Sequence, residues 1–299
     1  MAKIALLMSG GLAKGAYQIG ALRALAEYFS PEDFTCVSAS SIGVLNAQSY
    51  LTGHMDEMLS FWESANADSK RKNVVRFLHG PYLPAAIHEL AGFGQSPVPF
   101  YASFLQAKER TIYYADLREV PAEDLESYLA AAVSVPVVNR AVVINGVKYA
   151  DGGWVDNIPV FPLLPQKFDY VIGFYFDKYD YFFANEDLDR RVVRINFPNN
   201  SVISDSLFVD HESIMSMIGY GERFTAEVLK QVIGGDREDA ERVLANIAAA
   251  REAQKNVRDR ITADRMINGL SRVTNGFWRR AFLTGAGDGT GNDADGETK

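Results

Sequence analysis

The sequence predicts an α/β protein with a mostly parallel sheet covered by helices, followed by a helical C-terminal region. Two observations carry this prediction. Short apolar runs alternate with segments of helical periodicity from residue 3 to about 176, which is typical of consecutive strand-helix units. From about residue 206 to 282 the pattern turns helical, with long charged segments and few glycines between Asp236 and Asn268.

Short apolar runs mark the predicted strands. The run "KIALLM" (3–8) ends at Ser-Gly-Gly and precedes a segment of helical spacing, and "FTCVSA" (34–39) repeats that order before 41–51. A third strand, "TIYYAD" (111–116), precedes a helical pattern at 122–133. The remaining predicted strands are a pair within 141–151 that turns at Asn145-Gly146, then 169–176 and 191–197.

The composition divides the chain into three parts. We expect an α/β domain over 1–205, a helical region over 206–284 packed on or beside it, and a disordered acidic tail over 285–299, which is rich in Gly and Asp. The stretch 76–105 stands apart because it carries four prolines and six aromatic residues, with Glu89 its only carboxylate. Such an irregular apolar segment is either a buried connection or a mobile lid that covers an apolar site and contacts the membrane.

Charge and length narrow the class of protein. A chain of 299 residues, 47% of them hydrophobic, is long enough for one large core. The formal net charge of −8 argues against a nucleic-acid partner and against general attraction to an anionic membrane. Residues 251–280 nevertheless carry a local charge of +5, so this segment is either a solvated helix pair or a face that contacts a membrane.

Cysteine usage and the N-terminal segment bear on location. The single cysteine, Cys36, lies in an apolar run and is expected to be a buried core thiol, consistent with a reducing compartment. The apolar start of the chain is too short for a signal peptide, and no run reaches the length of a membrane span. We therefore expect a cytoplasmic protein, with any membrane contact peripheral, and we expect neither a metal nor a cofactor.

The segment "SGGLAKGAYQIG" (9–20) is a glycine turn between the first strand and its helix. It lacks the Gly-Lys-Ser/Thr end of a phosphate-binding loop and meets the dinucleotide fingerprint in no frame. Its free backbone N–H groups at a helix N-terminus suit an anion, either a phosphate or an oxyanion formed during acyl transfer. The alternative is a glycine turn needed only for tight packing. The candidate residues are Gly10, Gly11, Leu12, Ala13 and Lys14.

The second motif is the serine cluster in "CVSASSIGVLNA" (36–47). A nucleophile on a sharp strand-to-helix turn needs small residues two positions before and two positions after it. Only Ser41 meets this requirement, because Ala39 and Gly43 flank it, whereas Ser38 and Ser40 have larger neighbours. The alternative is that Ser40 or Ser41 only caps the following helix.

The third motif is "YADGGWVDNIPV" (149–160). Asp151 follows a predicted strand and precedes Gly152 and Gly153, so its carboxylate is expected at a strand end on a tight turn. Taken alone, Asp151 has the character of a turn aspartate.

Together the three motifs resemble the patatin-like phospholipase family. That family's glycine-rich oxyanion loop, G-x-S-x-G elbow and D-G-G/A motif correspond here to "SGGLAKGAYQIG", "ASSIGVLNA" and "DGGWVDNIP", in the family's order, from residue 3 to about 176. The resemblance implies a three-layer α/β/α fold and a Ser-Asp dyad, with Ser41 as nucleophile and Asp151 as general base. It also implies an oxyanion hole at residues 10–14. The sequence departs from the family pattern at Leu12 and Ala39, where glycine is usual.

The resemblance implies a lipid acyl hydrolase of the phospholipase A or lysophospholipase type, acting through a serine acyl-enzyme. Burial of Asp151 against apolar walls is expected to make it a stronger base than a free aspartate. A Ser-Asp-His mechanism is the alternative, and it would need His211, the only histidine after Asp151. A further alternative, motivated by Leu12 and Ala39, is a latent enzyme or regulatory protein that depends on a partner.

Overall fold

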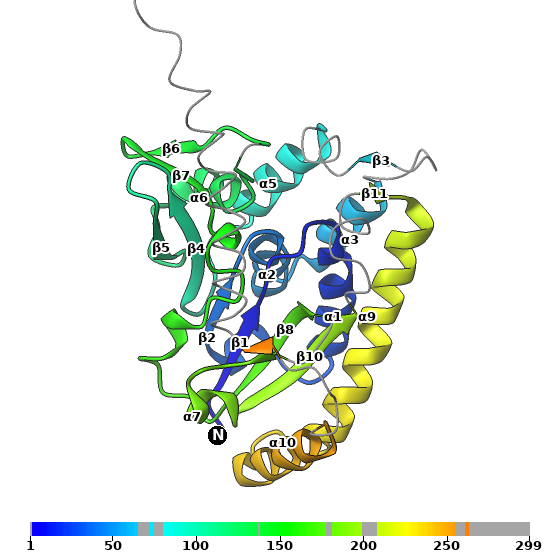
Figure 1. The fold of residues 1–299 in the computed structure, drawn as a ribbon. Coiled ribbons are helices and arrows are strands. Elements are labelled where there is room, and N and C mark those ends of the chain that lie inside the picture. The colour runs from blue at the N-terminus through cyan, green and yellow to red at the C-terminus, as the bar shows by residue number, and fades with distance from the viewer. Residues whose placement is uncertain are drawn as a thin grey trace, which may run out of the picture.

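The computed structural model describes residues 2–64, 72–73, 80–136, 138–177, 181–198, 208–254 and 261–262. A mixed eight-stranded sheet lies at its centre, with the order β10-β8-β1-β2-β4-β7-β6 and with β5 paired to β4 (Figure 1). The strands β10, β8, β1, β2 and β4 run parallel, whereas β5 and β7 run antiparallel to β4, and β6 to β7. Their bounds are β1 Ile4–Met8, β2 Phe34–Ala39, β4 Phe100–Gln106, β5 Thr111–Asp116, β6 Val142–Ile144, β7 Val147–Asp151, β8 Tyr170–Asp177 and β10 Val192–Pro198.

Two short strand pairs lie outside the main sheet. They join β3 (Lys72–Asn73) to β11 (Phe208–Val209) and β9 (Tyr181–Phe182) to β12 (Ile261–Thr262).

Helices flank the sheet on both faces, as the sequence predicted. The larger core lies on one face, under α1, α2, α3, α5, α6, α9 and α10. The smaller core, on the other face, is closed by Leu163 of η5 and Leu188 of α7, so this layer consists of short segments. The bounds are α1 Gly15–Ala26, α2 Ile42–Leu51, α3 Met55–Ser64, α5 Tyr82–Gly92, α6 Leu125–Ala132, α7 Glu186–Asp189, α9 His211–Val232 and α10 Ala240–Gln254, with 3-10 turns η1 Leu12–Lys14, η2 Pro31–Asp33, η3 Ala122–Asp124, η4 Gly152–Trp154 and η5 Phe161–Leu163.

Strand β4 aligns the two strands that carry the candidate dyad. Because β5 occupies one edge of β4 from Tyr101 to Gln106, β2 and β7 share its other edge. They approach from opposite directions, and their last residues pair with positions of β4 on either side of Ser103. Ala39 pairs with Ala102, and Asp151 pairs with Phe104. The C-terminal ends of β2 and β7 therefore meet at Ser103.

The sequence did not predict β4. The stretch 76–105 is not an irregular segment in its described part, because it forms helix α5 and the first residues of β4. Leu83, Ile87 and Leu90 of α5 are buried in the larger core, and Phe100 is fully buried. Of the aromatic residues, Phe100, Tyr101 and Phe104 belong to β4, whereas Phe93, Pro97 and Pro99 lie in the connection between α5 and β4. Residues 76–79 lie outside the described part of the chain.

The C-terminal helix α9 packs directly on α1, which Figure 1 shows as two neighbouring helices at one side of the sheet. The contact depends on two glycines. A Cβ on Gly20 would lie 2.0 Å from the carbonyl oxygen of Ile218, and a Cβ on Gly221 would lie 2.0 Å from that of Tyr17. The helix backbones touch at this crossing, so α9 is part of the layer that supports the glycine turn before α1.

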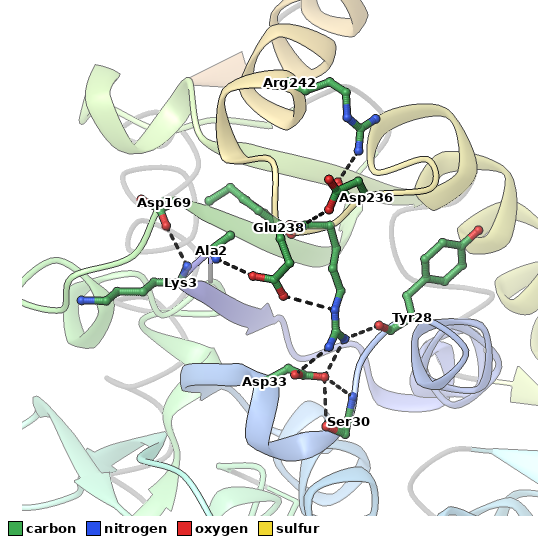
Figure 2. Close-up of polar contacts among 11 residues, drawn as sticks. Ala2, Lys3, Tyr28, Ser30, Asp33, Asp169, Asp236, Glu238 and Arg242 are labelled. Atoms are coloured by element: carbon green, nitrogen blue, oxygen red, sulfur yellow. Dashed lines mark hydrogen bonds and ion pairs between the residues drawn. The ribbon is translucent and has the colours of Figure 1, made fainter.

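Arg237, between α9 and α10, anchors the C-terminal helices at the opposite end of α1. Its guanidinium donates to both carboxylate oxygens of Asp33, at 2.6 and 2.9 Å, and to the carbonyl oxygen of Tyr28. Figure 2 labels Asp33 and Tyr28 close together, with Ser30 beside Asp33. Burial alone would raise the pKa of Asp33, but hydrogen bonds from Ser30 and Arg237 outweigh it and hold that pKa below its usual range. Beside this cluster, Glu238 accepts a hydrogen bond from the Ala2 amide.

Three further expectations concern single segments. Cys36 is a free, buried thiol, and burial raises its pKa to about 12. No helix in the described ranges is long and apolar enough to cross a membrane.

The proposed tail 285–299 and most of the basic segment 251–280 lie outside the described residues. Arg251, which is described, pairs with the buried carboxylate of Asp189 at 2.5 Å.

We predict that Gly20→Ala and Gly221→Ala each lower the free energy of unfolding, by roughly 2 kcal/mol or more, because a methyl group cannot enter a backbone contact without separating the helices. Denaturant unfolding measures the change. Gly235→Ala is the matched control, since a Cβ there meets nothing within 4 Å. Equal stability of all three variants would contradict the direct helix contact.

Candidate active site

Ser41 stands on a sharp turn between β2 and α2. Its backbone angles are φ 53° and ψ −133°, a conformation that residues with a side chain rarely adopt. It occupies the N-cap position of α2, yet its hydroxyl makes no capping hydrogen bond and instead donates to Oδ2 of Asp151 at 2.5 Å. The strained turn thus points the Ser41 hydroxyl away from the helix end and towards a carboxylate.

The flanking small residues explain how this turn fits. A Cβ on Gly43 would lie 2.7 Å from the carbonyl oxygen of Ser9, so only glycine allows this approach. The amide of Gly43 donates to the Ser40 carbonyl at 3.0 Å and that of Val44 to the Ser41 carbonyl at 2.9 Å, which starts the helix. Ala39 is fully buried at the end of β2.

Asp151 ends β7 and is itself 5% exposed. Its Oδ1 accepts a hydrogen bond of 2.8 Å from the Gly153 amide, while its Oδ2 accepts the Ser41 hydroxyl. Burial raises the pKa of Asp151 to about 7, against the opposing effect of these two hydrogen bonds. A carboxylate with this pKa is far more basic than a free aspartate and is a suitable proton acceptor near neutral pH.

Gly152 brings the aspartate turn against β4. A Cβ on Gly152 would lie 2.4 to 2.6 Å from backbone atoms of Ser103 and Phe104, so the turn passes directly over the strand. On Gly153 a Cβ would lie 2.9 Å from the Ser40 hydroxyl. Gly152 is therefore required by a close backbone approach, whereas Gly153 lies against polar side chains.

The other two serines of the cluster have structural hydrogen bonds. The Ser38 hydroxyl donates to the carbonyl oxygen of Pro159 at 2.6 Å, and the Ser40 hydroxyl accepts from the Ser103 hydroxyl at 2.9 Å. Both side chains are buried. Of the three, only Ser41 contacts a carboxylate.

The glycine turn lies beside Ser41. A Cβ on Gly10 would lie 2.7 Å from Cβ of Ser41, which places this backbone in direct contact with the serine. The Gly10 amide donates to the Asn157 carbonyl at 3.3 Å, so it is not a free donor. Within the described residues, the amides of Gly11, Leu12 and Ala13 have no backbone acceptor.

Leu12 adopts a left-handed conformation, with φ 51°. This explains why glycine suits the position, since a leucine there costs about 1–2 kcal/mol. Lys14 is buried at the N-terminus of α1 and has a polar or ionic partner of its own. The Gly11 backbone lies against the ring of Phe176. A Cβ on Gly11 would lie 2.3 Å from Cε2 of that ring.

The described histidines lie away from the Ser41–Asp151 pair. His211 is the exposed first residue of α9, His54 stacks on Phe93 with 3.5 Å between ring centroids, and His88 contacts Glu126 at 2.9 Å on the surface. A direct hydrogen bond of 2.5 Å leaves no space for an imidazole between Ser41 and Asp151. The geometry therefore favours a dyad over the alternative that uses His211.

No group of three or more His, Cys, Asp or Glu side chains that could hold a metal ion occurs among the described residues. The described hydrogen bonds of the Ser41 and Asp151 side chains are with each other and with the Gly153 amide. Their chemistry is that of a hydroxyl beside a basic carboxylate.

The sequence motifs and this geometry agree with a comparison to known families. The model of the family described as patatin-like phospholipase matches residues 6–164, more than half of the chain. The protein belongs to the patatin-like phospholipase family. Membership places it in a family of lipid hydrolases, and the patatin-like match contains the glycine turn, the serine elbow and the aspartate turn.

The solved structures that match this chain are distant from it in sequence. VipD from Legionella pneumophila is 11% identical, with a TM-score of 0.44 over 93% of this chain and 79% of that one. Full-length ExoU from Pseudomonas aeruginosa, in complex with SpcU, is 13% identical, with a TM-score of 0.46 over 84% of this chain and 60% of that one. This chain therefore spans about three fifths of ExoU. No curated protein matches it.

The structure adds residues that the sequence did not single out. Asn157 contacts the glycine turn, and Ser103 supports Ser40. The Tyr114 hydroxyl donates to the half-buried carboxylate of Asp156. Partial burial raises the pKa of Asp156 to about 6, against hydrogen bonds from Tyr114 and the Ile158 amide. The signal for Asn157 was its place in the "DGGWVDNIPV" motif, whereas Ser103 and Tyr114 could not be placed without β4.

We predict that Asp151→Asn becomes more stable relative to wild type as pH rises. The folded pKa of about 7 lies above the unfolded value near 3.8, so the folded wild type binds the extra proton between these limits. In wild type, the contribution of Asp151 to the free energy of unfolding is fully present below about pH 4 and is lost as pH rises through 7. The difference in free energy of unfolding, Asp151→Asn minus wild type, should grow by up to about 4 kcal/mol from pH 4 to pH 7 and then level off.

Denaturant unfolding of both proteins across this pH range measures the difference. Asp156 is present in both proteins, so its titration contributes equally to each. A stability difference that does not change with pH would contradict the raised pKa of Asp151.

Proposed function

We propose that the protein is a lipid acyl hydrolase of the phospholipase A or lysophospholipase type, in which Ser41 is the nucleophile and Asp151 the general base. The observation that carries the proposal is the direct hydrogen bond from the Ser41 hydroxyl to a buried, basic carboxylate. Membership of the patatin-like phospholipase family supports a lipid ester as the substrate.

In the first half of the reaction, Asp151 accepts the proton of the Ser41 hydroxyl while Oγ attacks the carbonyl carbon of the fatty-acyl ester. The carbonyl oxygen becomes an oxyanion. When the tetrahedral intermediate collapses, the ester C–O bond breaks and the leaving alcohol takes the proton from Asp151. The acyl group stays on Ser41 as an ester.

The second half repeats these steps with water. Asp151 accepts a proton from water, the resulting hydroxide attacks the acyl-enzyme, and the fatty acid leaves as the proton returns to the Ser41 oxygen. A base with a pKa of about 7 is half ionised at neutral pH and can both accept and return the proton.

The amides of Gly11, Leu12 and Ala13 are the proposed donors to the oxyanion. They follow Gly10, which contacts Ser41, and they have no backbone acceptor among the described residues. Losing one such donor typically slows an enzyme about 100- to 1,000-fold. Gly10 is a weaker candidate, because its amide already donates to Asn157.

Contact with a lipid surface is part of the proposal. Val155, Phe161 and Leu164 are large apolar side chains that are 39%, 59% and 42% exposed, and they follow Asp151 closely in the chain. A peripheral membrane contact through such side chains would deliver a lipid ester without a membrane-spanning helix.

The strained leucine favours a second candidate, a latent form of the same enzyme. Leu12 at φ 51° makes the oxyanion loop less stable in this conformation than a glycine would. An activating protein or ligand that holds the loop would then raise turnover. Activity that appears only on addition of a cell extract would support this candidate.

We predict that a fluorophosphonate probe labels wild type and fails to label Ser41→Ala. Asp151→Asn should lose labelling and ester hydrolysis by about 1,000-fold or more, because Ser41 then lacks its base. Ser49→Ala and His211→Ala are the controls and should keep both. Ser49 is a buried serine of α2 that donates to the carbonyl oxygen of Asn46.

Labelling of Ser41→Ala would contradict the nucleophile assignment. A loss in His211→Ala equal to that in Asp151→Asn would favour a histidine-dependent triad. Mass spectrometry of the labelled peptide and release of fatty acid from a phospholipid measure the two properties.

We predict that kcat/KM rises with pH through an apparent pKa of about 7 and then becomes constant, because only ionised Asp151 accepts the Ser41 proton. Initial rates on a soluble ester between pH 5 and pH 9 test this. A profile that is flat down to pH 5 would exclude a base with this pKa.

A further inference from the structure

Asn157 joins the glycine turn to the aspartate turn. It exchanges two hydrogen bonds with Gly10: its side-chain Nδ2 donates to the Gly10 carbonyl at 3.1 Å, and its backbone carbonyl accepts from the Gly10 amide at 3.3 Å. These bonds connect positions that are 147 residues apart.

The Asn157 carboxamide fits tightly between the two turns. A Cβ on Gly10 would lie 2.5 Å from Oδ1 of Asn157, and a Cβ on Gly153 would lie 2.9 Å from the same atom. The amide of Gly153 is the one that binds Asp151, and Gly10 is the residue in contact with Ser41. One side chain therefore contacts the backbone next to the nucleophile and the backbone next to the base.

The glycine turn needs such an anchor. Leu12 holds a left-handed conformation that is unfavourable by about 1–2 kcal/mol, and a conformation of this kind persists only when its surroundings impose it. After Leu12, the Lys14 amide donates to the Gly11 carbonyl at 3.0 Å and leads into α1. Before it, the described hydrogen bonds are those of Gly10 with Asn157, of the Ser9 carbonyl with Gln18 Nε2 at 2.7 Å, and of the Ser9 amide with the Phe174 carbonyl at 2.9 Å. Of these, the bonds at Gly10 lie nearest to Leu12 in the chain.

We propose that Asn157 is a positioning residue for the oxyanion hole. Its two bonds to Gly10 fix the direction in which the amides of Gly11 and Leu12 point relative to Ser41. Among the described residues, its side chain makes no hydrogen bond to Ser41 or Asp151. This inference rests on the proposed function, because it assigns a role in stabilising the intermediate of that reaction.

Steady-state kinetics of Asn157→Ala on a soluble ester test the proposal. Each rate is divided by the concentration of folded protein, so that a loss of stability does not count as a loss of activity. A misdirected donor weakens transition-state binding more than ground-state binding, so kcat should fall about 10- to 100-fold while KM stays within about threefold. The rate of fluorophosphonate labelling should fall in parallel, since that reaction also develops negative charge on oxygen. The apparent acidic pKa should stay in place, because Asp151 keeps Ser41 and the Gly153 amide.

Asn157→Asp gives the second readout. Aspartate has nearly the same shape as asparagine but cannot donate to the Gly10 carbonyl, and it adds a negative charge next to the turn of Asp151. Turnover should fall at least as much as in Asn157→Ala, and the acidic pKa should move upward, because a neighbouring charge disfavours ionisation of Asp151. A purely structural asparagine would lower the folded fraction of Asn157→Ala but leave kcat per folded protein unchanged. The pKa shift in Asn157→Asp tests only that position 157 lies close to Asp151.

Asn185→Ala is the matched control. Asn185 also uses its side chain in a bond to the backbone, accepting from the Leu188 amide at 3.0 Å, but it caps α7 away from Ser41. This variant should lose stability and keep kcat. If Asn157→Ala keeps kcat within about threefold while wild type turns over, the role of Asn157 is overturned and the proposed function stands. If wild type neither turns over nor labels at Ser41, the proposed function itself fails.

Discussion

The hydrogen bond between the Ser41 hydroxyl and Asp151 imposes conditions on much of the surrounding structure. It requires a carboxylate that is removed from water, and burial raises the pKa of Asp151 to about 7. It also requires Ser41 in a backbone conformation that only a crowded turn maintains. Both conditions lower stability. The protein retains them where the nucleophile and its base are proposed to act, which agrees with the general observation that functional sites contain strain.

Strand β4 satisfies the geometric part of these conditions. The ends of β2 and β7 meet on one of its edges, and Gly152 lets the aspartate turn pass over its backbone. The glycine turn then reaches Ser41 through contacts at Gly10, and α9 supports the helix behind that turn through Gly20 and Gly221. The C-terminal helices therefore belong to the same packed unit as the glycine turn and the Ser41–Asp151 pair.

Local features of this site could be predicted from sequence, and non-local ones could not. The choice of Ser41 over Ser38 and Ser40 followed from small flanking residues, and the contact at Gly43 shows the crowding that this rule assumes. The strand β4 escaped prediction because prolines and aromatic residues obscured its pattern, and its antiparallel partners depend on pairing that no single segment encodes. The link of Asn157 to Gly10 spans 147 residues and depends on the tertiary fold, so no local sequence pattern predicts it. The catalytic roles of Ser41 and Asp151 stay predictions.

The structure of the protein after reaction with a fluorophosphonate tests the central claim most directly, because the adduct resembles the proposed tetrahedral intermediate. We expect a phosphorus atom bonded to Oγ of Ser41, with the phosphoryl oxygen about 2.7–3.1 Å from amides of the turn at Gly11 and Leu12. Phosphorus on another residue, or a phosphoryl oxygen pointing away from that turn, would contradict it.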